Sequence, residues 1–162
     1  KYRAGPTSAV LFVTHLLVAG LLARRAGIPV AWAVVGAALP DLVDKPLAAV
    51  GVVDLFHSVG HSALLAVVIL PAALLGRAGV AAAAGWVSHL LLDAGHVIVN
   101  GRAGDALFLL WPLSLPPDPL AIPPGEFFVY YLWSPSFVVE VAVWAGAAVL
   151  AVRAWRVRAD AA

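Results

Sequence analysis

Long apolar stretches alternate along the chain with short breaks that contain charged residues, proline or glycine. The apolar stretches cover residues 7–23, 28–39, 57–75, 78–99 and 127–152. A helix needs about 20 apolar residues to span a bilayer, so the pattern predicts helices embedded in a membrane. The second stretch is short, and we expect Pro40 to end it. A proline-rich loop, expected to be non-helical, separates the last two stretches.

Composition supports this interpretation. Of the 162 residues, 63% are hydrophobic and only 12% are charged, whereas soluble domains are about one quarter charged. We therefore predict an all-α, multi-pass transmembrane helix bundle with about five membrane-embedded helices, forming a single integral membrane domain over residues 1–162. No basic stripe indicates a nucleic-acid partner. The expected surroundings are the bilayer of the cell membrane, and the sequence predicts no oligomeric state.

The basic residues suggest an orientation in that membrane. With five passes, one face receives Arg24, Arg25, Arg77, Arg153, Arg156 and Arg158. The other face receives Lys1, Arg3, Lys45 and Arg102, together with Asp54, Asp105, Asp118 and Glu126. Because cytoplasmic loops carry an excess of Lys and Arg, the arginine-rich face should be cytoplasmic and the proline-rich loop should lie outside.

Ionisable residues interrupt the apolar stretches. Each costs a few kcal/mol at membrane depth and usually has a function. The set comprises His15, Asp41, Asp44, His57, His61, His89, Asp93, His96 and Glu140. At about 1.5 Å of rise per residue, all five stretches place such a group in one layer about 10 Å thick, in the outer half of the bilayer.

Helical spacing also groups these side chains. His89, Asp93, His96 and Asn100 follow one another at intervals that form a single stripe on a helix. His57 and His61 are four residues apart, so on a helix they would point the same way. Since the chain has no cysteine, any metal would be held by nitrogen and oxygen.

We therefore predict a metal site formed by His15, Asp41, His61, His89 and Asp93, with His57, His96 and Glu140 as possible additional members. Each residue taken alone could instead form a hydrogen bond to a neighbouring helix. Agreement in depth and in spacing favours the metal site.

Four short motifs occur in order: Thr14-His15; Leu-Pro-Asp-Leu-Val-Asp at 39–44; His-Ser-Val-Gly-His-Ser at 57–62; and Gly-Trp-Val-Ser-His-Leu-Leu-Leu-Asp at 85–93. In this order they resemble the YdjM-like family of membrane-bound metal-dependent hydrolases. The resemblance covers about residues 7–115, and the extra C-terminal helix at 127–152 lies outside it. The family is similar in its ligand pattern to zinc-dependent phospholipase C.

The resemblance implies one zinc ion held by Asp41, His61, His89 and Asp93. A second zinc would be held by His15 and Asp93, with Asp93 bridging the two ions. The chain departs from the family in its middle motif, where no arginine follows the first histidine and the two histidines are four rather than five residues apart. The second aspartate of the acidic motif comes three residues after the first rather than two.

Zinc held by His and Asp activates water at neutral pH. Asp41 or Asp44 would be the catalytic general base, or would orient a ligating histidine. We expect hydrolysis of a membrane lipid or lipid-linked ester, a phosphoester first, at a site that faces the extracytoplasmic side. Two alternatives stay open: a divalent-metal or proton transporter, and a non-catalytic membrane subunit whose cluster is structural.

Overall fold

The computed structural model describes residues 9–116, 129, 131–132 and 134–160. Its main helices are α1 (Ala9–Ala26), α2 (Val30–Ala49), α4 (Arg77–Val99) and α6 (Pro135–Ala159). A short helical stretch joins α2 to α4 and consists of η1 (Ala63–Leu65), α3 (Ala66–Ile69) and η2 (Leu70–Leu75); η3 (Ala103–Leu110) follows α4. These residues contain helices and no β-strand, which confirms the all-α prediction.

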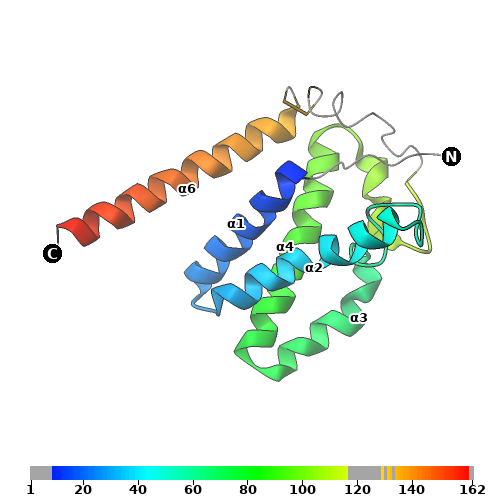
Figure 1. The fold of residues 1–162 in the computed structure, drawn as a ribbon, viewed down its shortest axis with the longest axis horizontal. Helices are drawn as coiled ribbons and strands as arrows, with labels where there is room; N and C mark the ends of the chain where they lie inside the picture. Colours follow the sequence, from blue (N-terminus) through cyan, green and yellow to red (C-terminus); the bar gives the residue numbers. More distant parts are fainter. Residues whose placement is uncertain (1–8, 117–128, 130, 133, 161–162) are drawn as a thin grey trace.

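Helices α1, α2 and α4 lie side by side, and the stretch 63–75 packs against α4 (Figure 1). α6 contacts α1 and α4, and its C-terminal part extends away from them. Two of the described helices, α4 and α6, are long and apolar enough to cross a membrane. The predicted bundle of about five membrane-embedded helices stays a prediction.

Glycines bring the backbones of α2 and α4 into contact. A Cβ atom added to Gly36 of α2 would lie 1.9 Å from the carbonyl oxygen of Ala82, and one added to Gly85 of α4 would lie 1.9 Å from that of Ala33. Small residues at a helix crossing permit this close approach. The crossing fixes α4, which carries His89, against α2.

The second predicted segment is longer than expected. We predicted that Pro40 ends it, and this was wrong, because α2 continues to Ala49. A proline inside a helix leaves the carbonyl four residues earlier without its N–H donor. The carbonyl next to that one, of Ala37, accepts a hydrogen bond from Nδ1 of His89 at 2.6 Å. This contact from α4 therefore lies beside the carbonyl of Gly36, which Pro40 leaves without its helical donor.

The third predicted segment contains less helix than expected. Residues 50–62 form turns and bends, and helical structure begins at Ala63. The prediction that His57 and His61 lie one turn apart on a helix was therefore wrong. The side chain of Asp44 accepts hydrogen bonds from three backbone N–H groups of this loop, so these donors are not available for helix formation.

The last helix begins later and ends later than the predicted range of 127–152. Pro135 occupies its first turn, and the hydroxyl of Ser134 caps it by accepting a hydrogen bond from the Phe137 N–H at 3.2 Å. The predicted start at residue 127 and most of the proline-rich loop, residues 117–124, lie outside the described residues.

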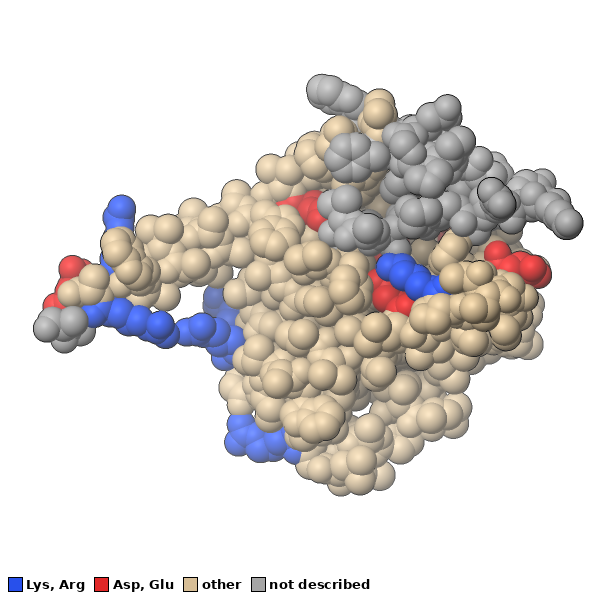
Figure 2. All heavy atoms as spheres, in the orientation of Figure 1, with Lys and Arg blue, Asp and Glu red and all other residues tan. Residues whose placement is uncertain are grey.

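The interior and the surface have unusual compositions. Many of the buried apolar residues are alanines, while the largest fully buried side chains include His15, His61, His89 and Asp44. Large aliphatic side chains such as Leu74 are exposed instead. In Figure 2 most of the visible surface is uncharged, with basic atoms gathered mainly toward the end of α6 and the lower left. The fold thus surrounds polar side chains with small apolar ones.

Candidate metal centre

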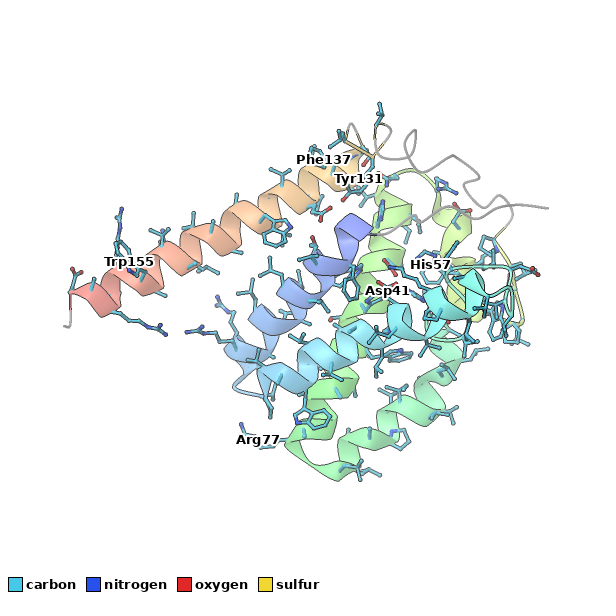
Figure 3. The ribbon with its side chains drawn as sticks, in the orientation of Figure 1. Asp41, His57, Arg77, Tyr131, Phe137 and Trp155 are labelled. Carbon is cyan, nitrogen blue, oxygen red and sulfur yellow. The ribbon has the colours of Figure 1, made fainter. Side chains whose placement is uncertain are left out.

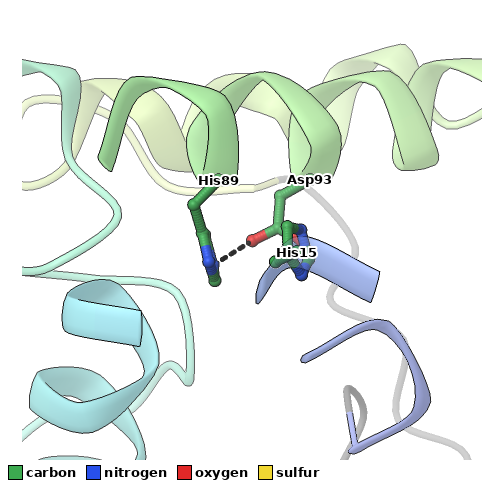
Figure 4. A group of neighbouring side chains, drawn as sticks. All are labelled: His15, His89 and Asp93. Atoms are coloured by element: carbon green, nitrogen blue, oxygen red, sulfur yellow. Dashed lines mark ion pairs between the residues drawn. The ribbon is translucent and has the colours of Figure 1, made fainter. Parts of the chain in front are cut away.

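The five predicted metal ligands come from four parts of the fold and meet at one place. His15 lies on α1, Asp41 on α2, His61 on the loop 50–62, and His89 and Asp93 on α4. All five are buried, with at most 5% exposure. Their ligand atoms form three overlapping groups, each within 4.8 Å: His15, His89 and Asp93; Asp41, His61 and His89; His57, His61 and Asp93. Figure 4 shows the first group.

Hydrogen bonds indicate which nitrogen of His61 and His89 faces the cluster. Nδ1 of His61 donates to Oδ2 of Asp44 at 2.7 Å, and Nδ1 of His89 donates to the carbonyl of Ala37 at 2.6 Å. A carboxylate and a carbonyl only accept, so in the neutral rings the lone pairs are at Nε2. These two Nε2 atoms are 3.1 Å apart. Facing lone pairs at that distance repel each other unless a proton or a metal ion lies between them.

The spacing of the cluster atoms fits a metal ion. Tetrahedral ligands 2.0–2.1 Å from zinc lie about 3.3 Å from one another. Oδ2 of Asp93 is 3.2 Å from Nε2 of both His61 and His89. Oδ1 of Asp41 is 3.5 Å and 4.0 Å from the same two nitrogens. Nε2 of His61 and of His89 and Oδ2 of Asp93 can therefore surround one ion, with Asp41 farther away at its edge.

The two oxygens of Asp93 face different histidines. Oδ2 faces His61 and His89, whereas Oδ1 lies 3.1 Å from Nε2 of His15. The ring of His15 stacks on that of His89, with centroids 4.0 Å apart. Among the described residues, Nδ1 of His15 is buried without a hydrogen-bond partner. Nε2 of His15 and Oδ2 of Asp93 lie at ion-pair distance from their neighbours but form no hydrogen bond of good geometry. A buried polar atom without a partner costs about 1–3 kcal/mol, and a bound cation would remove that cost.

Asp44 holds the loop that carries His61. Its carboxylate accepts hydrogen bonds from the backbone N–H groups of Ser58 and Gly60, at 2.7 Å each, and from that of His61 at 3.2 Å. The indole N–H of Trp86 on α4 donates to the carbonyl of Gly60 at 3.0 Å. Asp44 is fully buried. Of the two roles expected for it, these contacts favour orienting His61 over acting as a general base.

His57 borders the same cluster on a more open side. Its Nε2 lies 3.6 Å from Oδ2 of Asp93, and its side chain is 30% exposed. The ring also meets the edge of His61, and Phe108 of η3 packs against it with ring centroids 5.2 Å apart. His57 therefore belongs to the cluster, although the helix expected to carry it is absent from the loop.

His96 and Glu140 lie outside the three described ligand groups. His96 faces the ring of Tyr131, with centroids 5.8 Å apart. The buried carboxylate of Glu140 accepts hydrogen bonds from Thr14 of α1 and from Tyr131. The hydroxyl of Thr14 also accepts a hydrogen bond from the indole N–H of Trp144 at 3.0 Å. Glu140 thus ties α6 to α1 and does not reach the metal ligands directly.

Carboxylates surround His61. Its Nε2 lies 3.2 Å from Oδ2 of Asp93 and 3.5 Å from Oδ1 of Asp41, and its Nδ1 lies 2.7 Å from Oδ2 of Asp44. The same carboxylates would attract a divalent ion at Nε2, which would displace any proton there as it binds.

Lys45 is a cluster neighbour that the sequence did not single out for the site. Its Nζ atom forms an ion pair with Oδ2 of Asp41 at 2.8 Å, one helical turn away. The spacing of four residues within α2 was visible in the sequence. It would have indicated this pair if α2 had been expected to continue beyond Pro40. Trp86 was also missed as a support for the loop, because nothing in the sequence places Gly60 beside it.

In Figure 3 Arg77 lies toward the lower edge of the view, away from Asp41 and His57. The buried His and Asp groups form a centre that can hold a metal ion. Comparison of the chain with protein-family models, with curated proteins and with solved structures gave no match.

Proposed function

We propose that the protein is a membrane-embedded, zinc-dependent hydrolase that acts on a lipid or lipid-linked ester, with a phosphoester as the first choice. The observation that carries the proposal is the pair of Nε2 atoms of His61 and His89, 3.1 Å apart, with each Nδ1 held by an acceptor. Outer contacts of this kind fix the ring orientation in metal sites. A buried pair that served only packing would not need this arrangement.

The donor set favours zinc. The candidate ligands are imidazole nitrogens and carboxylate oxygens, and the three closest of these atoms lie 3.1 Å or 3.2 Å from one another. These donors and this spacing suit zinc among the common divalent ions. When bound, such an ion supplies Lewis acidity and a water of lowered pKa. His61, His89 and Asp93 offer the three closest ligand atoms.

Asp41 is the best placed proton acceptor. Its Oδ1 atom lies at the edge of the cluster, 3.5 Å and 4.0 Å from the two histidine nitrogens, so the other three residues can hold the ion without it. Oδ1 can then accept the proton of the attacking water. Asp44 acts as a positioning residue through His61.

A lipid substrate follows from the surroundings of the centre. Two described helices are long and apolar enough to span a membrane, and large aliphatic side chains such as Val67 and Leu74 are 77% and 88% exposed. Their contact with lipid would remove apolar surface from water. A centre near the outer interface would meet headgroups that are still in the bilayer, and we place it on the extracytoplasmic side.

Metal analysis and hydrolysis assays on the purified full chain test the proposal. Wild type should retain about one or two zinc ions and hydrolyse a phospholipid or lipid ester in mixed micelles. His89→Ala should lose both properties because it removes a ligand. His96→Ala is the matched control, since this histidine lies on the same helix outside the ligand groups, and it should retain zinc.

Two other outcomes would favour one of the alternative functions over hydrolysis. Wild type without bound metal and without hydrolysis would indicate a non-catalytic subunit with a hydrogen-bonded cluster. Metal or proton flux into proteoliposomes, abolished by His89→Ala, with no hydrolysis would indicate a transporter.

A further inference from the structure

We propose that Lys45 forms an anion-binding position beside the metal ligands, so that the preferred substrate carries a negatively charged oxygen next to the bond that is cleaved. The inference rests on the proposed function and specifies its substrate class: a phosphodiester or another anionic ester rather than a neutral carboxylic ester. The anionic group could belong to a lipid headgroup or to a soluble phosphodiester.

The position of Lys45 supports this role. Nζ lies 2.8 Å from Oδ2 of Asp41, whose other oxygen faces His61. The lysine side chain is 31% exposed, while that of Asp41 is 5% exposed. Lys45 thus places a positive charge between the buried cluster and the outside.

The ammonium group has bonding capacity to spare. It carries three donors, and within the described part of the chain its ion pair is with Asp41. The ring of Phe12 lies 5.4 Å from Nζ and holds the ammonium group near α1 by a cation–π contact. A substrate oxygen that approached the cluster could accept a hydrogen bond from a second donor while Asp41 kept the first.

With two divalent ions bound, charge balance would also favour an anionic substrate. Asp41, Asp44 and Asp93 bring three negative charges to the cluster, which one divalent ion and Lys45 would neutralise. A second divalent ion would leave the centre positive, and buried net charge is costly. An anionic substrate would reduce that charge, whereas a neutral ester would not.

The basic groups elsewhere do not offer the same position. The described arginines at the ends of α1 and α6 lie in the last turns of those helices, and Arg77 is far from the cluster in Figure 3. Arg102 is ion-paired with Asp105. Lys45 is therefore the residue we assign to anion recognition.

The test uses the zinc-loaded full chain in detergent and three variants. Lys45→Met removes the charge but keeps the length of the stem, Lys45→Arg keeps the charge, and Arg153→Met removes an exposed charge on α6 as the matched control. Zinc content, binding of methylphosphonate by calorimetry, and KM and kcat are measured. The substrates are bis(p-nitrophenyl) phosphate, which is anionic, and p-nitrophenyl acetate, which is neutral.

Lys45→Met should keep its zinc, bind methylphosphonate about tenfold or more weakly, and raise KM for the anionic ester by a similar factor. KM for the neutral ester should change far less than KM for the anionic ester, and Lys45→Arg should restore most of the binding. Repeating the assay with phosphatidylglycerol in mixed micelles identifies the source, because a preference for the micellar diester indicates a lipid headgroup.

Equal methylphosphonate binding by Lys45→Met and wild type would overturn the inference. Loss of zinc from Lys45→Met would also overturn it, because Lys45 would then act only by holding Asp41 in place. A wild type that binds no zinc refutes the proposed function itself, whereas a zinc-loaded wild type that hydrolyses the neutral ester but ignores the phosphonate refutes only the role of Lys45.

Discussion

A hydrogen bond at Nδ1 decides which nitrogen of each central histidine faces the cluster. His61 is oriented by the carboxylate of Asp44, and His89 by the carbonyl of Ala37. The carbonyl of Ala37 lies beside the one that Pro40 deprives of its helical donor. A proline that we expected to end the helix thus lies next to a backbone acceptor that holds a candidate ligand.

The sequence predicted which residues join the cluster better than it predicted how their side chains are oriented. His15, His89 and Asp93 were named from the sequence because ionisable groups in apolar stretches are costly and because their depths agree. The acceptor for each imidazole could not be named. It depends on how α2 packs against α4 and on a loop whose path is fixed by tertiary hydrogen bonds.

Asp44→Asn tests the orienting role at this scale. The amide has one acceptor oxygen where the carboxylate uses two, so the contact with Nδ1 of His61 can be kept only if the NH2 group faces the N–H of Gly60. The amide oxygen is also a weaker acceptor for Nδ1 than a carboxylate oxygen. We expect zinc affinity or turnover to fall by about 10–100-fold, with zinc still binding at higher concentration. Competition with a fluorescent zinc chelator measures the affinity.

Asp54→Asn is the control, because this carboxylate is exposed on the same loop and should leave zinc affinity unchanged. Asp93→Ala shows how much zinc affinity is lost when a ligand is removed. If Asp44→Asn loses zinc as completely as Asp93→Ala, then Asp44 is itself a ligand and the roles of the two aspartates on α2 must be exchanged.

At the scale of elements, the crossing of α2 and α4 organises the centre. Gly36 and Gly85 allow the two backbones to touch, and Gly60 does the same where the loop lies on Pro40, since an added Cβ would be 2.7 Å from the Pro40 carbonyl oxygen. The loop and both helices are therefore held at contact distance by positions where glycine has no side chain to interfere.

Hydrophobic pattern predicted the elements unevenly. The stretch 78–99 matches α4 almost residue for residue, because one periodic apolar run without proline is favourable only as a helix. The stretch 57–75 was misjudged in its first part. Its composition is compatible with helix, but the backbone N–H groups of the loop donate to the carboxylate of Asp44 in the preceding helix. The hydrophobic pattern within one segment contains no information on an acceptor from another segment.

Gly85→Ala should disrupt the crossing. Its Cβ would lie 1.9 Å from the carbonyl oxygen of Ala33, so the helices must move apart, at a cost of about 1–3 kcal/mol. We expect a lower Tm and weaker zinc binding, because His89 is one turn further along the same helix. Thermal unfolding in detergent and zinc titration measure the two effects.

Gly95→Ala is the matched control on the same helix, because nothing lies within 4 Å of its added Cβ. Replacing a helical glycine with alanine should leave stability unchanged or raise it by up to about 1 kcal/mol. Equal effects of the two substitutions would mean that the close approach of α2 and α4 does not support the centre.

For the whole molecule, polarity is arranged around the cluster rather than on the surface. His15, His61 and His89 are almost completely buried, while long aliphatic side chains cover much of the outside. Arginines occur in the last turns of α1 and α6, and Arg77 begins α4. The membrane orientation stays a prediction that a direct measurement of sidedness tests.

Labelling of single introduced cysteines measures sidedness, because the chain contains no cysteine of its own that would react. Arg77 begins α4, and Ala103 begins η3, four residues beyond the other end of α4. The 23 residues of α4 span about 34 Å, enough to cross the hydrocarbon core. On intact cells a membrane-impermeant maleimide should label Ala103→Cys and should label Arg77→Cys only after permeabilisation, because the arginine-rich face is predicted to be cytoplasmic. The reverse pattern would place the metal centre near the cytoplasmic face. Labelling of both positions on intact cells would mean that α4 does not cross the membrane, and a centre built on His89 and Asp93 would then have to bind its substrate from solution.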